Sequence, residues 1–371
     1  MEERDFGERS RFRVPRANIG GMRLPEDMDE AAALIRHAID SGMRYIDTSR
    51  GYGDSELRFA KALKDGYRDK VILSTKHAPW SVKPEDLEGG TMADFIRREI
   101  DVQLGRLEVD YVDFYQAWSI NNQEHYDTMM KKGGMLEGIR RAMDEGLVRH
   151  TGFTTHASLE DLLVWIPQAD WAEVILFTYN VLNTKYAPAI ACAHGRGIGT
   201  IVMNPVGGGK LAAPSPVLMG LAQQVGAASA PQMAIRWLIT NDHVDTIISG
   251  ITRPSDVDDT IAAVEAGPFS GEQMAAIKAF QDKVAPEEAG FCTGCRYCMP
   301  CPQEVNIPAI MSCIYEDRYW GLTEWATKRY QGMKTGKADA CVQCGECEEK
   351  CTQDLEIMKE LAYAREKYGE S

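Results

Sequence analysis

Short apolar runs alternate with amphipathic stretches from about residue 17 to residue 267. Eight of the runs have the composition and length of β-strands, and they begin near residues 17, 44, 71, 112, 148, 173, 199 and 244. The stretches between them, such as residues 29–42 and 94–107, carry apolar residues at helical spacing. Strict alternation predicts parallel strands joined by right-handed crossovers, and eight such units predict an α/β fold of the closed (β/α)8 TIM-barrel type.

The architecture that competes with a barrel is an open, doubly wound parallel sheet. A sheet of that kind that binds a dinucleotide carries a G-x-G-x-x-G turn after its first strand. Residues 19–22 (Ile-Gly-Gly-Met) stand at that place and do not have the spacing. We therefore expect the barrel.

The character of the sequence changes near residue 284. The last amphipathic helix is expected to end there, and residues 285–290 (APEEAG) have the composition of a linker. From Phe291 onward, cysteine-rich turns alternate with helical stretches. We predict two domains, a barrel over residues 1–284 and a small α-helical domain over residues 285–371, because a barrel alone uses about 250 residues.

Charge and composition narrow the range of partners. The 371 residues carry a formal net charge of -14. An acidic surface argues against nucleic acid or anionic lipid as the main partner. No apolar run is long enough to span a bilayer, and the charged N-terminus has no apolar signal core. We expect a cytoplasmic protein without a nucleic-acid or membrane partner.

Nine of the ten cysteines lie between residues 292 and 351. Eight of them form two runs in which two residues separate neighbouring cysteines, except for three before the last: Cys292, Cys295, Cys298 and Cys301, then Cys341, Cys344, Cys347 and Cys351. Such gaps let one short loop place thiolates at successive corners of an iron–sulfur cubane, and in two-cluster ferredoxins the fourth thiolate comes from the opposite run. The spacing predicts two [4Fe–4S] clusters in a ferredoxin-like domain.

Tetrahedral zinc is the alternative for cysteine pairs separated by two residues. Zinc needs two such pairs for each ion, whereas this chain has two triplets that are each followed by a fourth cysteine. Cys192 and Cys313 lie outside the pattern. Cys313 is part of an apolar, helix-like stretch, so we expect it to be a small buried side chain rather than a ligand.

Candidate catalytic residues follow the second and third expected strands, and catalytic groups of barrels lie at such carboxyl ends. Residues 47–56 (DTSRGYGDSE), 74–76 (STK), 201–211 (IVMNPVGGGKL) and 232–238 (QMAIRWL) resemble aldo/keto reductases. The resemblance covers about residues 16–284. With the two cysteine runs, the chain is similar to the subgroup of aldo/keto reductases that carries a ferredoxin-like C-terminal domain.

The resemblance implies an oxidoreductase in which Tyr52 donates a proton to the substrate carbonyl as hydride arrives from NAD(P)H. Tyrosine ordinarily titrates near pH 10, so the resemblance implies that Lys76 lowers the pKa of Tyr52. Asp47 would keep Lys76 charged and oriented. The alternative for either Asp47 or Lys76 alone is a buried structural ion pair, but the joint motif favours the catalytic interpretation.

At the fourth catalytic position, this chain departs from the pattern of the family. Family members usually carry histidine near the end of the fourth strand, where this chain has Trp118. Tryptophan donates one N–H but does not titrate. His125, in the next loop, is the candidate substitute, and a solvated loop histidine is the alternative interpretation. His156 lies two residues after Thr154 and therefore shares its inward face, where it either lines the pocket or caps the strand.

The nicotinamide positions depart as well. Family members often hold the carboxamide with a Ser/Asn pair and a glutamine, and the matching residues here are Thr154, Thr155 and Leu176. Leucine cannot form a hydrogen bond to an amide. We expect Thr154 and Asn180, both inward-facing, to compensate.

The nucleotide end retains more of the family pattern. The stretch that contains Asn204, Gly208 and Lys210 resembles the pyrophosphate loop, in which backbone N–H groups approach phosphate and Lys210 adds charge. After the eighth strand, Gly250 leads into a loop where Arg253 could read a 2′-phosphate, whereas Asp256 would oppose one. Both NADH and NADPH stay open.

A nicotinamide passes two electrons as hydride, whereas a [4Fe–4S] cluster passes one, and no flavin motif is visible. One hypothesis is that the barrel reduces a small-molecule carbonyl substrate (an aldehyde, ketone or sugar) with NAD(P)H, beside structural or redox-sensing clusters. A second is that the clusters feed single electrons from a redox partner protein to the barrel. A third is an electron-transfer protein with a non-catalytic barrel, which the intact Asp47, Tyr52 and Lys76 argue against.

Overall fold

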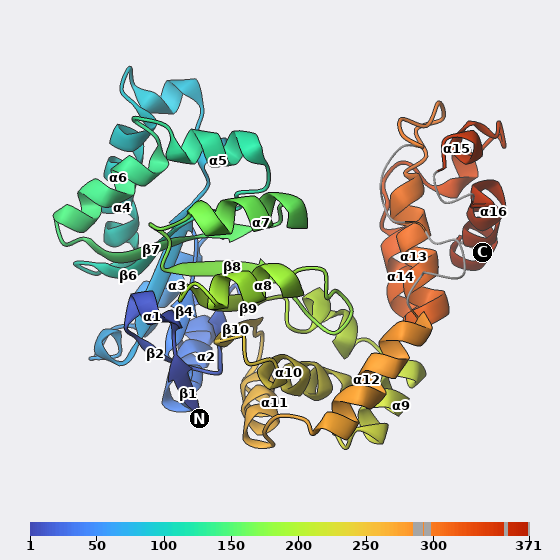
Figure 1. Ribbon diagram of the computed structural model, residues 1–371, viewed down its shortest axis with the longest axis horizontal. Helices are drawn as coiled ribbons and strands as arrows, with labels where there is room; N and C mark the ends of the chain where they lie inside the picture. The colour runs from blue at the N-terminus through green and yellow to red at the C-terminus, as the bar shows by residue number, and fades with distance from the viewer. Residues whose placement is uncertain (285–291, 293–297, 352–354, 370–371) are drawn as a thin grey trace. The chain divides into compact units, whose positions relative to one another are not determined.

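A computed structural model describes residues 1–284, 292, 298–351 and 355–369 (Figure 1). The chain forms two compact units. The barrel unit comprises residues 1–208 and 234–268, and the C-terminal unit comprises residues 209–233 together with the described part of 269–371. Within the described ranges, no helix is long and apolar enough to cross a membrane.

Eight parallel strands close the barrel in the order β10-β3-β4-β5-β6-β7-β8-β9. Their bounds are β3 (Ala17–Gly20), β4 (Tyr45–Asp47), β5 (Ile72–His77), β6 (Val112–Ala117), β7 (Val148–Thr155), β8 (Val174–Thr178), β9 (Gly199–Met203) and β10 (Thr246–Gly250). Each lies within one of the eight runs that the sequence marks as strands. The structure therefore confirms the predicted closed barrel.

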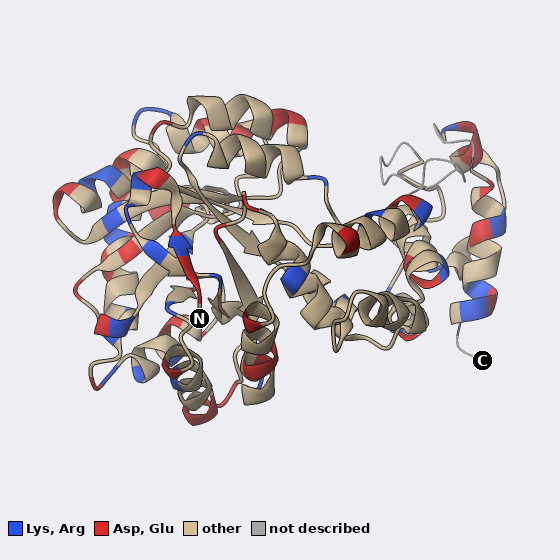
Figure 2. Ribbon diagram, turned by 60° about the horizontal axis from the view of Figure 1, so that its bottom comes forward, with Lys and Arg blue, Asp and Glu red and all other residues tan. Residues whose placement is uncertain are grey.

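Helices follow the strands and cover the outside of the barrel (Figure 1). They are α2 (Met28–Asp40), α3 (Ser55–Ala62), α4 (Met92–Leu107), α5 (Gln123–Met130), α6 (Met135–Asp144), α7 (Leu159–Gln168), α8 (Ala187–His194), α10 (Ala230–Thr240) and α11 (Pro254–Glu265). Charged side chains are concentrated on these helices, whereas the strands are nearly free of them (Figure 2). This is the distribution that the alternating sequence pattern requires.

An antiparallel hairpin, which the sequence analysis did not anticipate, precedes the barrel. It consists of β1 (Glu3–Asp5) and β2 (Arg13–Pro15), joined through α1 (Gly7–Ser10). Phe6, at its centre, is fully buried, and its ring lies 5.4 Å from the rings of both Tyr45 and Phe114. One aromatic residue thus anchors a charged segment to the apolar interior of the barrel.

The C-terminal unit is helical. Its helices are α9 (Pro216–Gln224), α12 (Gly271–Val284), α13 (Ile307–Trp320), α14 (Thr323–Gln331), α15 (Glu346–Glu349) and α16 (Ile357–Tyr368). Cys313 on α13 is fully buried in an apolar core, as expected, and six of the motif cysteines pack against the same core. Residues 209–233 also pack in this unit. The compact units of the structure therefore differ from the domains expected from the sequence, and the domain boundary at residues 284–285 stays a prediction.

Candidate active site

Strands β4 and β5 are neighbours, so their carboxyl ends bring Asp47 and Lys76 together. The Lys76 ammonium forms an ion pair with Asp47 and donates to the Thr48 carbonyl at 2.9 Å. Both side chains are almost completely buried. Burial lowers the pKa of Lys76, but Asp47 and Tyr52 together raise that pKa by more, so the amine stays protonated. The Lys76 ammonium is therefore a fixed cation inside the barrel, paired with the Asp47 carboxylate.

Tyr52 lies in the turn between β4 and α3, with the Lys76 ammonium 4.8 Å from the centre of its ring. Burial raises the pKa of Tyr52, and Lys76 opposes that rise. The sequence analysis expected Lys76 to lower the pKa. Lys76 does act in that direction, but burial outweighs it. Tyr52 therefore keeps its proton at neutral pH, as a proton donor must.

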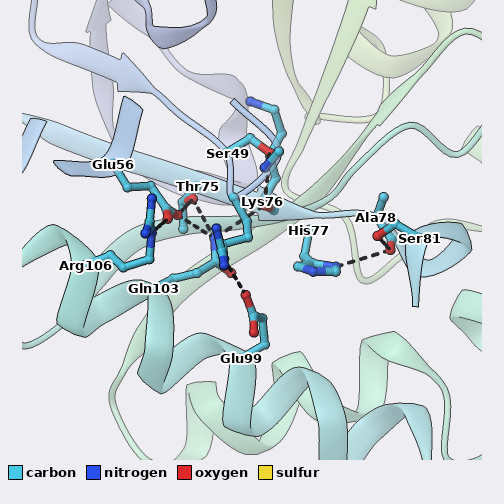
Figure 3. Close-up of polar contacts among 12 residues, drawn as sticks. Ser49, Glu56, Thr75, Lys76, His77, Ala78, Ser81, Glu99, Gln103 and Arg106 are labelled. Atoms are coloured by element: carbon cyan, nitrogen blue, oxygen red, sulfur yellow. Dashed lines mark hydrogen bonds and ion pairs between the residues drawn. The ribbon is translucent and has the colours of Figure 1, made fainter. Parts of the chain in front are cut away.

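A buried network fixes the turn that carries Tyr52 (Figure 3). Glu56, on α3, is fully buried and accepts hydrogen bonds from the Thr75 hydroxyl at 3.0 Å and from the Gln103 amide at 2.7 Å. Arg106 on α4 donates to the second Glu56 oxygen at 2.8 Å and to the Gly53 carbonyl at 3.0 Å. Gly53 directly follows Tyr52, so the network ties this turn to β5 and α4.

Trp118, which the sequence analysis placed at the position of the family's histidine, packs against Tyr52. The two ring centres are 5.4 Å apart, and the rings meet edge to face at 84°. A Cβ atom on Gly51 would lie only 2.3 Å from the indole. The indole thus occupies the space beside Tyr52, and Gly51 is required for it to fit.

His125, the candidate substitute for the histidine, lies on α5, and the rings of Trp118 and Trp80 stand between it and Tyr52. Its ring stacks on Trp80 at 6.2 Å, and Trp80 contacts Trp118 at 6.0 Å. The His125 Nδ1 atom lies 3.3 Å from the Ser119 carbonyl. Trp80 is 49% exposed. These contacts place His125 within an aromatic surface that two indoles connect to Tyr52.

The polar groups expected to hold the nicotinamide carboxamide have partners within the protein. The Thr154 hydroxyl accepts from the Ser119 N–H at 2.8 Å. The Asn180 amide donates to the Asn204 carbonyl at 3.0 Å, and its oxygen accepts a backbone N–H two residues further on. Leu176 is buried in the apolar core of the barrel. A bound carboxamide would have to share or displace these contacts.

Two further residues, Thr155 at the end of β7 and His156 directly after it, lie at the same carboxyl edge of the barrel. The Thr155 hydroxyl is buried and donates to the Ile120 carbonyl at 2.7 Å. His156 is exposed, and its Nδ1 atom lies 3.2 Å from the Thr178 hydroxyl. Thr155 is thus structural, whereas His156 is accessible to a bound molecule.

Two of the loops assigned to the nucleotide meet at Arg23, a residue that the sequence analysis did not single out. Arg23 donates to the Gly208 carbonyl at 3.0 Å, and its Cδ atom lies 3.0 Å from where a Cβ of Gly250 would be. Asn204 and Gly208 both have left-handed backbone conformations. Among the described residues Arg23 has no acidic partner. The sequence signal that could have identified Arg23 is its position as a basic residue in the loop after the first barrel strand.

The other two basic candidates are paired. Arg253 contacts Asp256 at 2.9 Å, so its charge is opposed, a pairing that the sequence analysis did not predict. Lys210 lies in the C-terminal unit and forms an ion pair with Glu316 of α13.

The motif cysteines line a hollow in the C-terminal unit. Its lining includes Cys298, Cys301, Cys341, Cys344 and Cys347. These thiols line the hollow rather than converge on one point: among the described residues, no three Cys, His or acidic side chains are grouped for a single metal ion. Cys295 lies outside the described residues.

The grouping crosses the two sequence runs. Three cysteines of the second run share the hollow with Cys298 and Cys301, the third and fourth of the first run. Two-cluster ferredoxins exchange their fourth ligands in this way. The residues present therefore fit a cubane cluster.

Comparison with known proteins defines the class. Residues 17–282 match the aldo/keto reductase family, and residues 291–356 match the 4Fe-4S dicluster domain. The barrel is thus that of an oxidoreductase, joined to an iron–sulfur domain. The chain belongs to the aldo/keto reductase family, and its C-terminal domain implies two [4Fe–4S] clusters. The predicted family, enzyme class and dicluster domain are confirmed.

Several relatives share the barrel at low identity. The L-glyceraldehyde 3-phosphate reductase of Escherichia coli K12 is 22% identical over 295 residues, which cover 67% of this chain and 83% of the relative. An uncharacterized oxidoreductase of Schizosaccharomyces pombe is 23% identical over 262 residues, covering 67% and 81%. The structure of the aldo-keto reductase AKR11C1 from Bacillus halodurans, in its holo form, matches with a TM-score of 0.64 and 22% identity, covering 75% of this chain and 96% of that one.

Proposed function

We propose that the barrel reduces the carbonyl group of a small molecule with NAD(P)H, and that Tyr52 is the general acid. The observation that carries this proposal is the contact of a protonated, largely buried Tyr52 with the Lys76 ammonium, which Asp47 holds in place. A proton donor beside a fixed cation at the carboxyl edge of a barrel suits the protonation of a carbonyl oxygen.

Each of the three residues has a separate task. Tyr52 donates its phenolic proton to the carbonyl oxygen and becomes a phenolate. Lys76 stabilises that phenolate, because a buried ammonium nearby lowers the cost of the negative charge. Asp47 keeps Lys76 charged. When bound, NAD(P)H supplies the hydride.

Residues at the edges of β3, β7, β8, β9 and β10 would hold the dinucleotide. The candidates from the sequence are Thr154, Asn180, Asn204, Gly208, Lys210, Gly250 and Arg253, to which the structure adds Arg23. Gly208 and Gly250 let the backbone come close to phosphate, and Arg23, which has no acidic partner in the part of the chain that the structure describes, supplies a positive charge next to both. The nucleotide end of the site therefore fits the cofactor better than the carboxamide end does.

A second candidate function follows from the carboxamide end. Leu176 is apolar, and the Thr154 and Asn180 groups already have partners. These contacts favour, over an ordinary reductase, an enzyme whose clusters deliver single electrons to the barrel from a redox partner protein. The cysteines of both runs would then take part in turnover.

One experiment separates the two functions. Anaerobically purified protein is titrated with NADPH and NADH, while cluster absorbance and nicotinamide fluorescence are followed, and candidate carbonyls are then assayed. Carbonyl reduction with no bleaching of the clusters supports the first function. Absence of nicotinamide binding in protein that holds both clusters supports the second.

The role of Tyr52 is tested by Tyr52→Phe. Loss of a general acid should lower kcat by about 10²–10⁴. Tyr67→Phe is the control, because the Tyr67 hydroxyl donates a hydrogen bond to Asp40 on the outside of the barrel. This variant should leave kcat unchanged. Full turnover by Tyr52→Phe would overturn the assignment.

A further inference from the structure

Two polar side chains meet at the carboxyl edge of the barrel, where β7 and β8 end. Side chains on a strand alternate between its two faces. Val174 and Leu176 of β8 belong to the apolar core of the barrel, so Thr178, the last residue of β8, continues their inward-facing row. His156 follows β7 and shares the face of Thr154. Its Nδ1 atom lies 3.2 Å from the Thr178 hydroxyl, so both side chains stand above the barrel core.

Lys185 lies beside this pair, in the segment between β8 and α8. Its ammonium is 4.5 Å from the centre of the Tyr186 ring, and the Tyr186 hydroxyl donates to the Ala157 carbonyl at 2.6 Å. Ala157 directly follows His156, so the fully buried Tyr186 ties the segment of the lysine to that of the histidine. Burial lowers the pKa of His156, and the nearby charge of Lys185 lowers it further.

The three polar groups have donor capacity that carboxylates leave unused. In the described ranges, neither His156 nor Lys185 forms an ion pair with an acidic side chain, and both residues are exposed. Because the Thr178 hydroxyl is the partner of Nδ1, Nε2 is the ring nitrogen of His156 that a bound molecule can reach. A hydroxyl, an imidazole and an ammonium are donors that suit a phosphate or a carboxylate.

This group of donors lies across the barrel from the proton donor. In the closed order of eight strands, β7 and β8 are three and four places from β4, the strand that precedes Tyr52. The phosphate-binding candidates Arg23, Gly208 and Gly250 belong to other loops, those after β3, β9 and β10. An anion at His156 would therefore belong to the molecule that meets Tyr52 rather than to the dinucleotide.

We propose that His156, Thr178 and Lys185 form a subsite for an anionic group of the carbonyl substrate. The inference rests on the proposed carbonyl reduction and names the class of its substrate. This substrate is an aldehyde or ketone that carries a phosphate or carboxylate several bonds from its carbonyl carbon, because the subsite and Tyr52 stand on opposite sides of the barrel edge. Lys185 and His156 bind the anion while Tyr52 protonates the carbonyl oxygen.

The test compares two matched pairs of aldehydes with NADPH and NADH in the cluster-containing protein. The pairs are para-carboxybenzaldehyde with benzaldehyde, and erythrose 4-phosphate with erythrose. The native protein should prefer the anionic member of at least one pair about tenfold in kcat/KM, the size of two partly exposed charged contacts. The pair that shows the preference identifies the anion as carboxylate or phosphate. Equal kcat/KM within both pairs overturns the proposal.

Two variants assign the preference to these residues. Lys185→Gln and His156→Ala should each reduce it about threefold, chiefly through KM, and the double variant should nearly abolish it. Both side chains are exposed, so thermal unfolding of the variants should match that of the native protein. A preference that neither variant alters contradicts the subsite. Variants that raise the KM for NADPH instead of the KM for the aldehyde would assign these groups to the cofactor and overturn the proposal.

The matched control is Lys70→Gln, which changes the net charge equally. Lys70 precedes β5, at the opposite edge of the barrel, and pairs with Asp40 at 3.3 Å. It should leave the preference unchanged, and an equal loss in this variant would assign the preference to net charge and overturn the subsite.

Ionic strength provides a measurement on the native protein alone. Added salt screens exposed charges, so the preference for the anionic aldehyde should decline as salt increases, and a preference that salt does not alter contradicts the proposal. Reduction of benzaldehyde without any preference within either pair overturns this inference alone. Absence of NAD(P)H-dependent reduction of all four aldehydes overturns the proposed function, and this inference with it.

Discussion

The side chains around Tyr52 set its proton affinity and its mobility. Burial raises the pKa, Lys76 counteracts the rise, and Trp118 covers one edge of the ring. In place of the histidine that the family usually has, the tyrosine is flanked by an indole that does not titrate. The proton donor therefore depends on the Lys76–Asp47 pair for its electrostatic tuning.

The pH dependence of carbonyl reduction should show this arrangement. Tyr52 is active when protonated, which holds below its pKa, and burial places that pKa above the ordinary value of about 10. We expect no loss of kcat/KM that is due to Tyr52 between about pH 6 and 9, and a decline only at higher pH. A profile of kcat/KM against pH checks this. A basic limb within the neutral range would mean that another group governs the proton transfer.

Gly51 and Trp118 form a close contact that can be tested directly. In Gly51→Ala the new methyl group would lie 2.3 Å from the indole, so we expect a loss of about 1–3 kcal/mol in unfolding free energy and a fall in kcat/KM. Thermal unfolding and steady-state kinetics measure the two effects.

Two variants make the assignment to this contact specific. In a Trp118→Ala background, Gly51→Ala should cost much less unfolding free energy than it does in the native protein. Gly53→Ala meets no atom within 4 Å but has a φ of +59°, so its cost should reflect backbone strain alone. Equal costs for Gly51→Ala with and without Trp118 would rule out the clash as the cause.

At the scale of elements, Glu56 joins the turn after β4 to its neighbours. It connects α3 to β5 through Thr75 and to α4 through Gln103 and Arg106, and Arg106 reaches back to Gly53. Three elements that are separate in sequence thereby hold the turn that carries the proton donor.

Glu56→Gln should therefore affect both stability and catalysis. It leaves Arg106, which is 22% exposed, without its carboxylate, and we expect a loss of about 2 kcal/mol in unfolding free energy, less than for a fully buried pair. Lys64→Gln is the control, because it breaks an exposed pair with Glu108 that contributes less than about 1 kcal/mol. Chemical denaturation and kcat measure the outcome. A kcat that remains native would show that Glu56 stabilises the fold without positioning Tyr52.

At the scale of the whole molecule, two units divide the chemistry. The barrel carries the Tyr52 site, and the C-terminal unit carries the cysteines that fit two clusters. The chain crosses between them inside the candidate pyrophosphate loop, after Gly208.

The hollow predicts which cysteines share a cluster. Cys301→Ala and Cys341→Ala should remove the same cluster, leaving about four of eight irons per chain, since both thiols line one hollow. Cys313→Ala is the control: burial raises the pKa of Cys313 to about 11, and the thiol lies in the apolar core, so iron should be retained. Iron and sulfide analysis with electron paramagnetic resonance distinguishes the clusters. Loss of different clusters from the two variants would contradict the shared hollow.

Much of the fold and part of the site could be read from the sequence. The eight strands and the barrel follow from periodicity and the cluster motifs follow from spacing, because these are local properties of the chain. The family, and with it the roles expected of Asp47, Tyr52 and Lys76, came from the resemblance of short motifs at strand ends to aldo/keto reductases. The N-terminal hairpin was missed because charged residues dominate it, and the burial of Phe6 depends on the barrel it enters.

What only the tertiary structure decided is which charges are opposed and which are not. Lys210, Arg253 and Arg23 look alike in the sequence, yet the first faces Glu316, the second faces Asp256, and the third has no acidic partner among the described residues. The packing of Trp118 on Tyr52 was equally hidden. The sequence determined where functional groups stand along the chain, whereas their partners come from distant elements, and only folding brings those elements together.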